Sequence, residues 1–146
     1  MPFTLLKLAD AYGIKVEYWD FQPPLEAVYW FSPGLPPVIG LANSLFENRR
    51  YFRCVLAEEL GHHFTTVGEA VPKMFYRYGD RLDISKAEHR AMVWAAKYLM
   101  PADRLLGALS FGIVEQWELA DYFEVTEDMV RFRMGLWDMR QICLAG

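Results

Sequence analysis

The sequence predicts an α+β fold in which a small N-terminal sheet packs on the helix that carries the main motif, with further helices C-terminal to it. Short alternating or apolar stretches separated by Pro and Gly occupy residues 14–43, whereas helical patterns dominate from about residue 45 onward. The order of helix, small sheet and then helices is typical of α+β proteins. With 146 residues and 53% hydrophobic content, the chain is expected to form a single domain over residues 1–146.

The N-terminal third is predicted to contain one helix and three strands. Apolar positions indicate a helix over residues 3–12, which Gly13 ends. The alternating stretch "IKVEYW" predicts a strand, "FQPPLE" interrupts it, and "AVYWFS" and "VIGLAN" predict two more strands joined by the turn "PGLPP". Because "VIGLAN" directly precedes the next helix, we expect it to form a sheet edge that could bind an extended peptide.

Helical patterns fill the rest of the chain. A helix is expected over residues 45–65, followed by a loop over residues 66–82, which glycines and a proline interrupt. The stretch "SKAEHRAMVWAAKYLM" predicts another helix, with Ser85 as its N-cap. Two or three shorter helices should follow, one near residues 113–122 and one that Thr126 caps and that reaches about residue 139.

Composition narrows the classes of function. The formal net charge of −4 disfavours a general binder of nucleic acid or of anionic membranes, which would be expected to be basic. The two cysteines, Cys54 and Cys143, fit free thiols in a reducing compartment better than a disulfide framework. The N-terminus has no signal-peptide pattern, and the longest apolar run, "LLGALSFGIV", is too short to span a bilayer. We therefore expect a cytoplasmic protein with no membrane or nucleic-acid partner.

The stretch "CVLAEELGHHFTT" (residues 54–66) is the main candidate for chemistry. In a helix, side chains four residues apart share a face, so Glu58 pairs with His62 and Glu59 with His63, and either pair could bind a metal. A zinc-peptidase helix of the form H-E-x-x-H uses its histidines as ligands and its glutamate as a base. In that register Glu58 takes the place of the first histidine, Glu59 is the catalytic base and His62 is the second ligand.

The metal set needs a third protein ligand. Carboxylate oxygen is a competent zinc ligand, so Glu58 does not forbid binding, although it would favour harder ions such as manganese. Glu88, early in the following helix, is the best candidate for the third ligand, and the adjacent His89 could replace it. An alternative comes from "SKAE", a capping box in which Glu88 would bond to the backbone N–H of Ser85; the local sequence alone favours this cap.

Two segments resemble the ImmA/IrrE-type metallopeptidases of bacteria and their mobile elements. The segment "LAEELGHHFT" is similar to the family's usual "LAHELGHH", and "EHRAMVWAAKYLMP" is similar to its E-x-x-A segment followed by an aromatic residue, an alanine pair and "LMP". The resemblance implies a gluzincin-like α+β core in which His62 and Glu88 bind zinc and Glu59 is the catalytic glutamate. Glu58 is where the chain departs from the family pattern.

The resemblance also implies an activity. It indicates an endopeptidase that cleaves or inactivates a repressor-type regulatory protein of a phage or mobile element, with zinc, manganese or another divalent metal as cofactor. Glu58 leaves open a second hypothesis, a catalytically degenerate regulator on the same fold that binds its partner without cleaving it. The candidates for stabilising an oxyanion are His63, Tyr76 and Tyr78.

The C-terminal stretch "WELADYFEVTEDMVRFRM" could form a helix-turn-helix motif. Apolar residues stand where such a motif packs its core: Leu119, Ala120, Val125 and Val130. The second helix would, however, present Glu127 and Asp128 to DNA phosphates at its start. We therefore favour structural packing of these helices over DNA binding.

Overall fold

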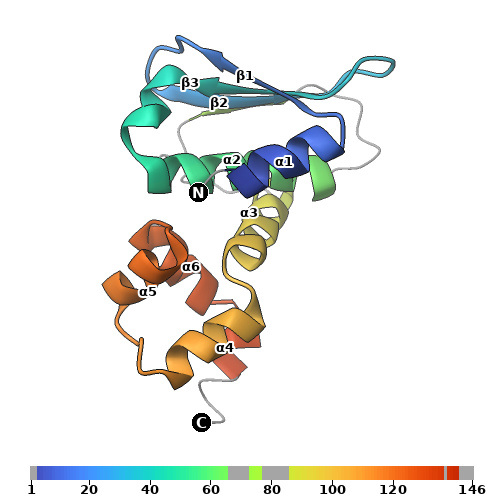
Figure 1. Cartoon of the computed structure of the whole chain (residues 1–146). Helices are drawn as coiled ribbons and strands as arrows, with labels where there is room; N and C mark the ends of the chain where they lie inside the picture. Colours follow the sequence, from blue (N-terminus) through green and yellow to red (C-terminus); the bar gives the residue numbers. More distant parts are fainter. Residues whose placement is uncertain (1–2, 66–72, 77–85, 137, 142–146) are drawn as a thin grey trace.

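The predicted α+β fold is confirmed by a computed structural model of the chain, which describes residues 3–65, 73–76, 86–136 and 138–141. The elements in chain order are α1 (Phe3–Ala11), β1 (Lys15–Trp19), β2 (Leu25–Trp30), β3 (Val38–Ala42), the 3-10 helix η1 (Asn43–Glu47), α2 (Arg49–Thr65), β4 (Lys73–Tyr76), α3 (Lys86–Leu99), α4 (Ala102–Ser110), α5 (Gln116–Phe123) and α6 (Glu127–Met134). The sheet lies on one side of α2, and α3 leads from α2 to the C-terminal helices (Figure 1).

The sheet is mixed, with the strand order β1-β3-β2-β4. Strand β3 pairs in parallel with β1, where Lys15 faces Val38, and antiparallel with β2, where Val28 faces Gly40. The expectation that "VIGLAN" forms a sheet edge is therefore wrong, because β3 has a hydrogen-bonded neighbour on each side. Its residues 39–42 are all buried, as a central strand covered on both faces requires. Among the described strands, the edges are β1 and β4.

Helix α2 runs through the centre of the protein. Of its residues 52–62, all but Arg53 are buried, which is the pattern of a helix covered on every side. Leu41 of β3, Leu56 and Leu60 of α2 and Ala95 of α3 belong to the same hydrophobic core. The sheet and α3 therefore enclose α2, and the polar side chains of its central turns point into the interior.

The C-terminal helices follow the predicted capping pattern with one shift. The hydroxyl of Thr126 accepts a hydrogen bond from the backbone N–H of Met129 at 3.1 Å, so the predicted cap of α6 is confirmed. The helix expected from about residue 113 begins at Gln116, because Glu115 and Glu118 form a capping box there. The four apolar residues of the predicted helix-turn-helix core are buried: Leu119, Ala120, Val125 and Val130.

Two arginines of α2 attach the C-terminal helices to the centre. The guanidinium of Arg53 donates to the carbonyl oxygens of Phe123 and Glu124, at 2.6 and 2.7 Å, where α5 ends. Arg50 bonds the carboxylate of Asp121 at 2.6 Å. Since the last carbonyls of a helix have no partner within it, Arg53 satisfies acceptors that α5 leaves open.

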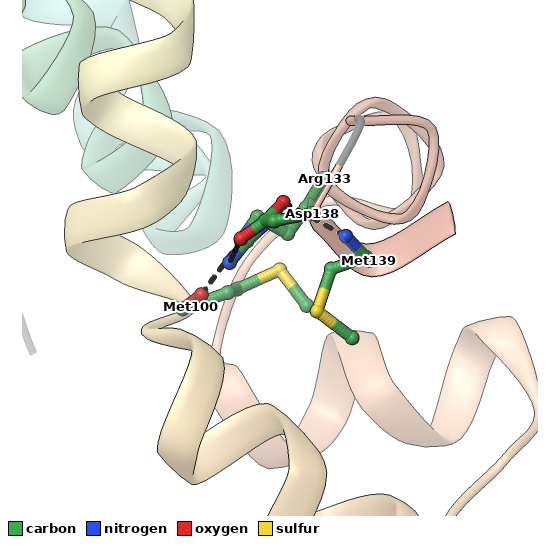
Figure 2. A network of polar contacts seen from close by, with 4 residues as sticks. All are labelled: Met100, Arg133, Asp138 and Met139. Carbon is green, nitrogen blue, oxygen red and sulfur yellow. Dashed lines mark hydrogen bonds and ion pairs between the residues drawn. The ribbon is translucent and has the colours of Figure 1, made fainter. Parts of the chain in front are cut away.

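The buried side chain of Arg133 joins α6 to the end of α3 and pairs with the partly exposed Asp138 (Figure 2). The guanidinium of Arg133 is 1% exposed, donates to the carbonyl oxygen of Met100 at 2.8 Å and bonds both carboxylate oxygens of Asp138 at 2.9 and 3.1 Å. Arg133 holds the pKa of Asp138 below its ordinary value, through its hydrogen bonds and its charge. The hydrogen bond to Met100 ties α6 to the turn between α3 and α4.

Within the described residues, no helix combines the length and apolar character needed to cross a bilayer.

Candidate active site

Three ionisable side chains lie inside the protein on two consecutive turns of α2. Glu58, Glu59 and His62 are each at most 1% exposed. The helical spacing places Glu58 and His62 on one face, and Oε1 of Glu58 lies 3.9 Å from Nε2 of His62. The sequence-based expectation that these two side chains meet is confirmed.

The separation of Glu58 and His62 suits a shared metal ion. Zinc binds histidine nitrogen and carboxylate oxygen at about 2 Å, and its tetrahedral geometry places two ligand atoms about 3.3 Å apart. Oε1 of Glu58 and Nε2 of His62 are 3.9 Å apart, so a shared ion requires these two side chains to approach each other slightly. A cation between the two side chains would also offset the free energy that burial of a carboxylate requires. Both the donor set and its burial therefore fit a metal.

Burial strongly perturbs the ionisation of Glu59. Burial raises its pKa from the ordinary 4.5 to about 8, and the charge of Glu88 adds to this shift. Glu88, at the start of α3, thus lies near enough to act on Glu59 electrostatically. A carboxylate whose pKa is close to neutral pH can both accept and donate a proton in a catalytic cycle.

The crossing of α2 and α3 explains how Glu88 reaches this region. Gly61 lies directly on α3: a Cβ atom at Gly61 would stand 3.0 Å from Cα of Ala91 and closer still to the carbonyl oxygen of Ala91. Glu88 precedes Ala91 by three residues and therefore lies on the same side of α3. The glycine between the glutamates and the histidines of the motif is thus the point of helix contact.

His63 faces the sheet. Its Nδ1 is hydrogen-bonded to the hydroxyl of Tyr29 on β2 at 2.8 Å. Burial lowers the pKa of His63 and raises the pKa of Tyr29 to about 12, so both groups are neutral at pH 7. Because His63 already has this partner, Glu58 and His62 are favoured over Glu59 and His63 as the metal-binding pair. The same hydrogen bond argues against His63 as the group that stabilises an oxyanion. The side chain of Tyr76 and the whole of Tyr78 lie outside the described residues.

The alternative third ligand His89 faces another element. It is exposed, and its ring packs edge-on against Phe132 of α6 with 5.9 Å between centroids. The capping alternative for Glu88 involves Ser85, which lies outside the described residues. In the described part of the chain, no three His, Cys, Asp or Glu side chains stand close enough to form a complete metal cage. The structure therefore brings together Glu58 and His62, with Glu59 and Glu88 in electrostatic contact beside them.

Sequence reasoning missed Tyr29. The hydrogen bond of Tyr29 to His63 joins residues 34 positions apart, and no local pattern indicates such a contact. The close approach at Gly61 did have a signal, because a glycine inside a helical pattern often marks a packing constraint.

The buried E-E-x-x-H segment of α2 has the register of a zinc-peptidase helix with Glu58 in the place of the first histidine, and a family comparison identifies the group. Residues 9–134 match the family of M78 peptidases described as the IrrE N-terminal-like domain, and the chain belongs to that family. The resemblance seen in the two motif segments is confirmed. Members of the family are generally zinc-dependent peptidases. No curated protein matches the chain significantly.

Proposed function

We propose that the protein is a metal-dependent endopeptidase that cleaves or inactivates a repressor-type regulatory protein of a phage or mobile element. The buried cluster of Glu58, Glu59 and His62, with Glu88 acting on Glu59 from α3, is the observation that carries the proposal. Membership in the M78 family supports the peptidase class. The regulatory substrate rests on the resemblance alone.

In this proposal Glu58, His62 and Glu88 hold the metal. The 3.9 Å between Glu58 and His62 supports the first two ligands, and the packing of α3 at Gly61 supports Glu88. Zinc fits this donor set, and manganese is the alternative ion because two of the three ligands are carboxylates. When bound, the ion would polarise the scissile carbonyl and lower the pKa of a water molecule.

Glu59 is the proposed acid–base group. Its carboxylate accepts the proton of the attacking water and then donates it to the leaving amine nitrogen. The complete burial of Glu59 supports this role, since a site that excludes water strengthens each charge interaction in the reaction.

Strand β4 is the proposed place for an extended substrate. It is an edge of the described sheet, and Lys73 of β4 pairs with Tyr29, whose hydroxyl is bonded to His63 at the end of α2. An added strand along β4 would gain main-chain hydrogen bonds next to the motif helix.

The test uses the full chain and the repressor-type protein encoded nearest to it as substrate. With zinc, the wild-type protein should contain about one metal per chain and cleave the repressor; Glu59→Gln should keep the metal and lose cleavage, and His62→Ala should lose both. Cleavage by Glu59→Gln would remove this residue from the mechanism.

The substitution of the family's first histidine by Glu58 favours one other function, a regulator that binds its partner without cleaving it. In that case the repressor binds the wild-type protein and Glu59→Gln with equal affinity, with or without metal, and stays intact. Cleavage by the zinc-loaded wild-type protein would rule this alternative out.

A further inference from the structure

The segment joining α4 to α5, together with α5, exposes a set of large apolar side chains. Phe111 is 87% exposed, Val114 and Trp117 are each 59% exposed, and Tyr122 is 47% exposed. We call these four residues the aromatic face. Single exposed hydrophobic residues are ordinary, but four within residues 111–122, including Phe, Trp and Tyr, are typical of a protein-binding segment.

A shallow surface groove includes Trp117 and Tyr122 of the aromatic face. It has a volume of about 330 Å3 and is lined by Ile113, Trp117, Glu118, Asp121 and Tyr122. The residues of α5 in this lining follow the spacing of one helix face, with Trp117 four residues before Asp121 and Glu118 four before Tyr122. The groove thus combines apolar walls with two carboxylates.

The charge around the groove is mainly negative. Glu118 accepts a hydrogen bond from the backbone N–H of Glu115, so two glutamates stand at the start of α5. Arg50 bonds the carboxylate of Asp121, so this carboxylate is already paired with a cation. On the other side of Val114, a second groove is lined in part by Arg131 and Arg140, and Arg131 pairs with Asp128.

We propose that the aromatic face binds an amphipathic, positively charged helix of a partner protein. Apolar side chains of that helix would cover Trp117 and its neighbours, and its lysines or arginines would lie beside Glu115 and Glu118. Nucleic acid would place phosphates against these carboxylates, and a second copy meeting the face symmetrically would place the same carboxylates against one another. The sheet lies on the far side of α2 from α5, so strand addition is not available here (Figure 1).

The test measures binding of two fluorescein-labelled synthetic helices of about five turns. Both carry leucine on one face at positions i, i+3, i+4 and i+7; one carries lysine elsewhere and the other glutamate. Fluorescence anisotropy should show that the lysine peptide binds the full chain at least about tenfold more tightly than the glutamate peptide.

Variants then locate the site. Trp117→Gln and Phe111→Gln should each weaken the lysine peptide about tenfold, since aromatic anchors dominate such interfaces. The matched control is Phe46→Gln, because Phe46 is 61% exposed but lies on η1, outside the aromatic face. Circular dichroism and thermal unfolding verify that each variant is folded. Because Phe111 is the most exposed of the four residues, the Phe111→Gln variant can still be tested if Trp117→Gln unfolds.

Several results would overturn the proposal. The first is that the lysine peptide does not bind, and the second is that both peptides bind equally tightly. The third is that Phe46→Gln weakens binding of the lysine peptide as much as Trp117→Gln and Phe111→Gln do. Sedimentation that shows self-association of the wild type but not of Phe111→Gln would assign the face to a second copy. A large loss of stability in both Phe111→Gln and Trp117→Gln would assign it to a segment of the chain itself, and duplex DNA binding that depends on Phe111 would assign it to nucleic acid.

Discussion

Gly61 of α2 packs directly on the backbone of Ala91 in α3, and this contact sets how closely the two helices of the site approach. A side chain at position 61 would collide with main-chain atoms, which cannot rotate away as a flexible side chain can. The distance between Glu59 and Glu88 therefore depends on the absence of one Cβ atom.

Gly61→Ala should lower the free energy of unfolding by about 1–3 kcal/mol, because overpacking pushes α3 away from α2. Isothermal titration should also show weaker zinc binding. The matched control is Gly107→Ala in α4, where an added Cβ meets nothing within 4 Å and alanine improves helix propensity. Equal stability of the two variants would contradict the role of the Gly61 contact.

The stability of the metal-free protein should depend on the ionisation of Glu59. In the folded protein its pKa is raised from 4.5 to about 8, so the native state holds a proton that the unfolded chain releases. The resulting stabilisation is fully present below pH 4.5 and is lost as the pH rises through about 8. Urea unfolding in a chelator should show this decrease in the wild type and a flatter profile in Glu59→Gln. The control variant is Glu127→Gln, on the exposed start of α6, which should keep the wild-type profile.

Asp138→Asn should lower the free energy of unfolding by about 3 kcal/mol, because it leaves the buried guanidinium of Arg133 without its charge partner. The comparison is Asp128→Asn, whose pair with Arg131 is exposed and should contribute at most about 1 kcal/mol.

Since the pKa of Asp138 is lowered, its contribution is present above about pH 3.8 and is lost as the pH falls through the lowered value. Chemical unfolding at pH 7 and over a series of pH values below 3.8 tests both statements; equal losses at pH 7 would argue against a special role of the Arg133–Asp138 pair.

Tyr29→Phe should destabilise the protein by about 1 kcal/mol, the usual net contribution of one hydrogen bond. Its partner is Nδ1 of His63, so a double-mutant cycle with His63→Ala should give a coupling energy of similar size. Tyr18→Phe is a suitable control, since Tyr18 is 37% exposed on β1 and its ring contacts Phe46 and Phe52. Additive effects of Tyr29→Phe and His63→Ala would show that the hydrogen bond contributes nothing.

The fold could be predicted from local patterns because helix and strand periodicities are local properties. The edge assignment of "VIGLAN" failed for a physical reason: nearness to α2 in the chain does not decide which strands flank β3. The better signal was the unbroken apolar run "VIGLA", which is typical of a strand buried on both faces.

The site was predictable only where helix geometry fixes it. A spacing of four residues brings Glu58 to His62 in any α-helix, so that contact could be expected from sequence. The contact of Tyr29 with His63 depends on how the sheet lies on α2, and the bond of Arg133 to Met100 depends on how α6 meets α3. Such relationships arise from tertiary packing, which leaves no periodic signal.

The enclosure of α2 on every side has a consequence for how this protein could change under selection. At positions 58 and 59, methionine has nearly the volume of glutamate and no polar or charged group to desolvate, so it should raise the melting temperature while abolishing any acid–base chemistry. A laboratory evolution experiment that rewards heat resistance alone would thus erase the acidic pair first. If the same experiment also selected for function, retention of both carboxylates would show that the function requires them.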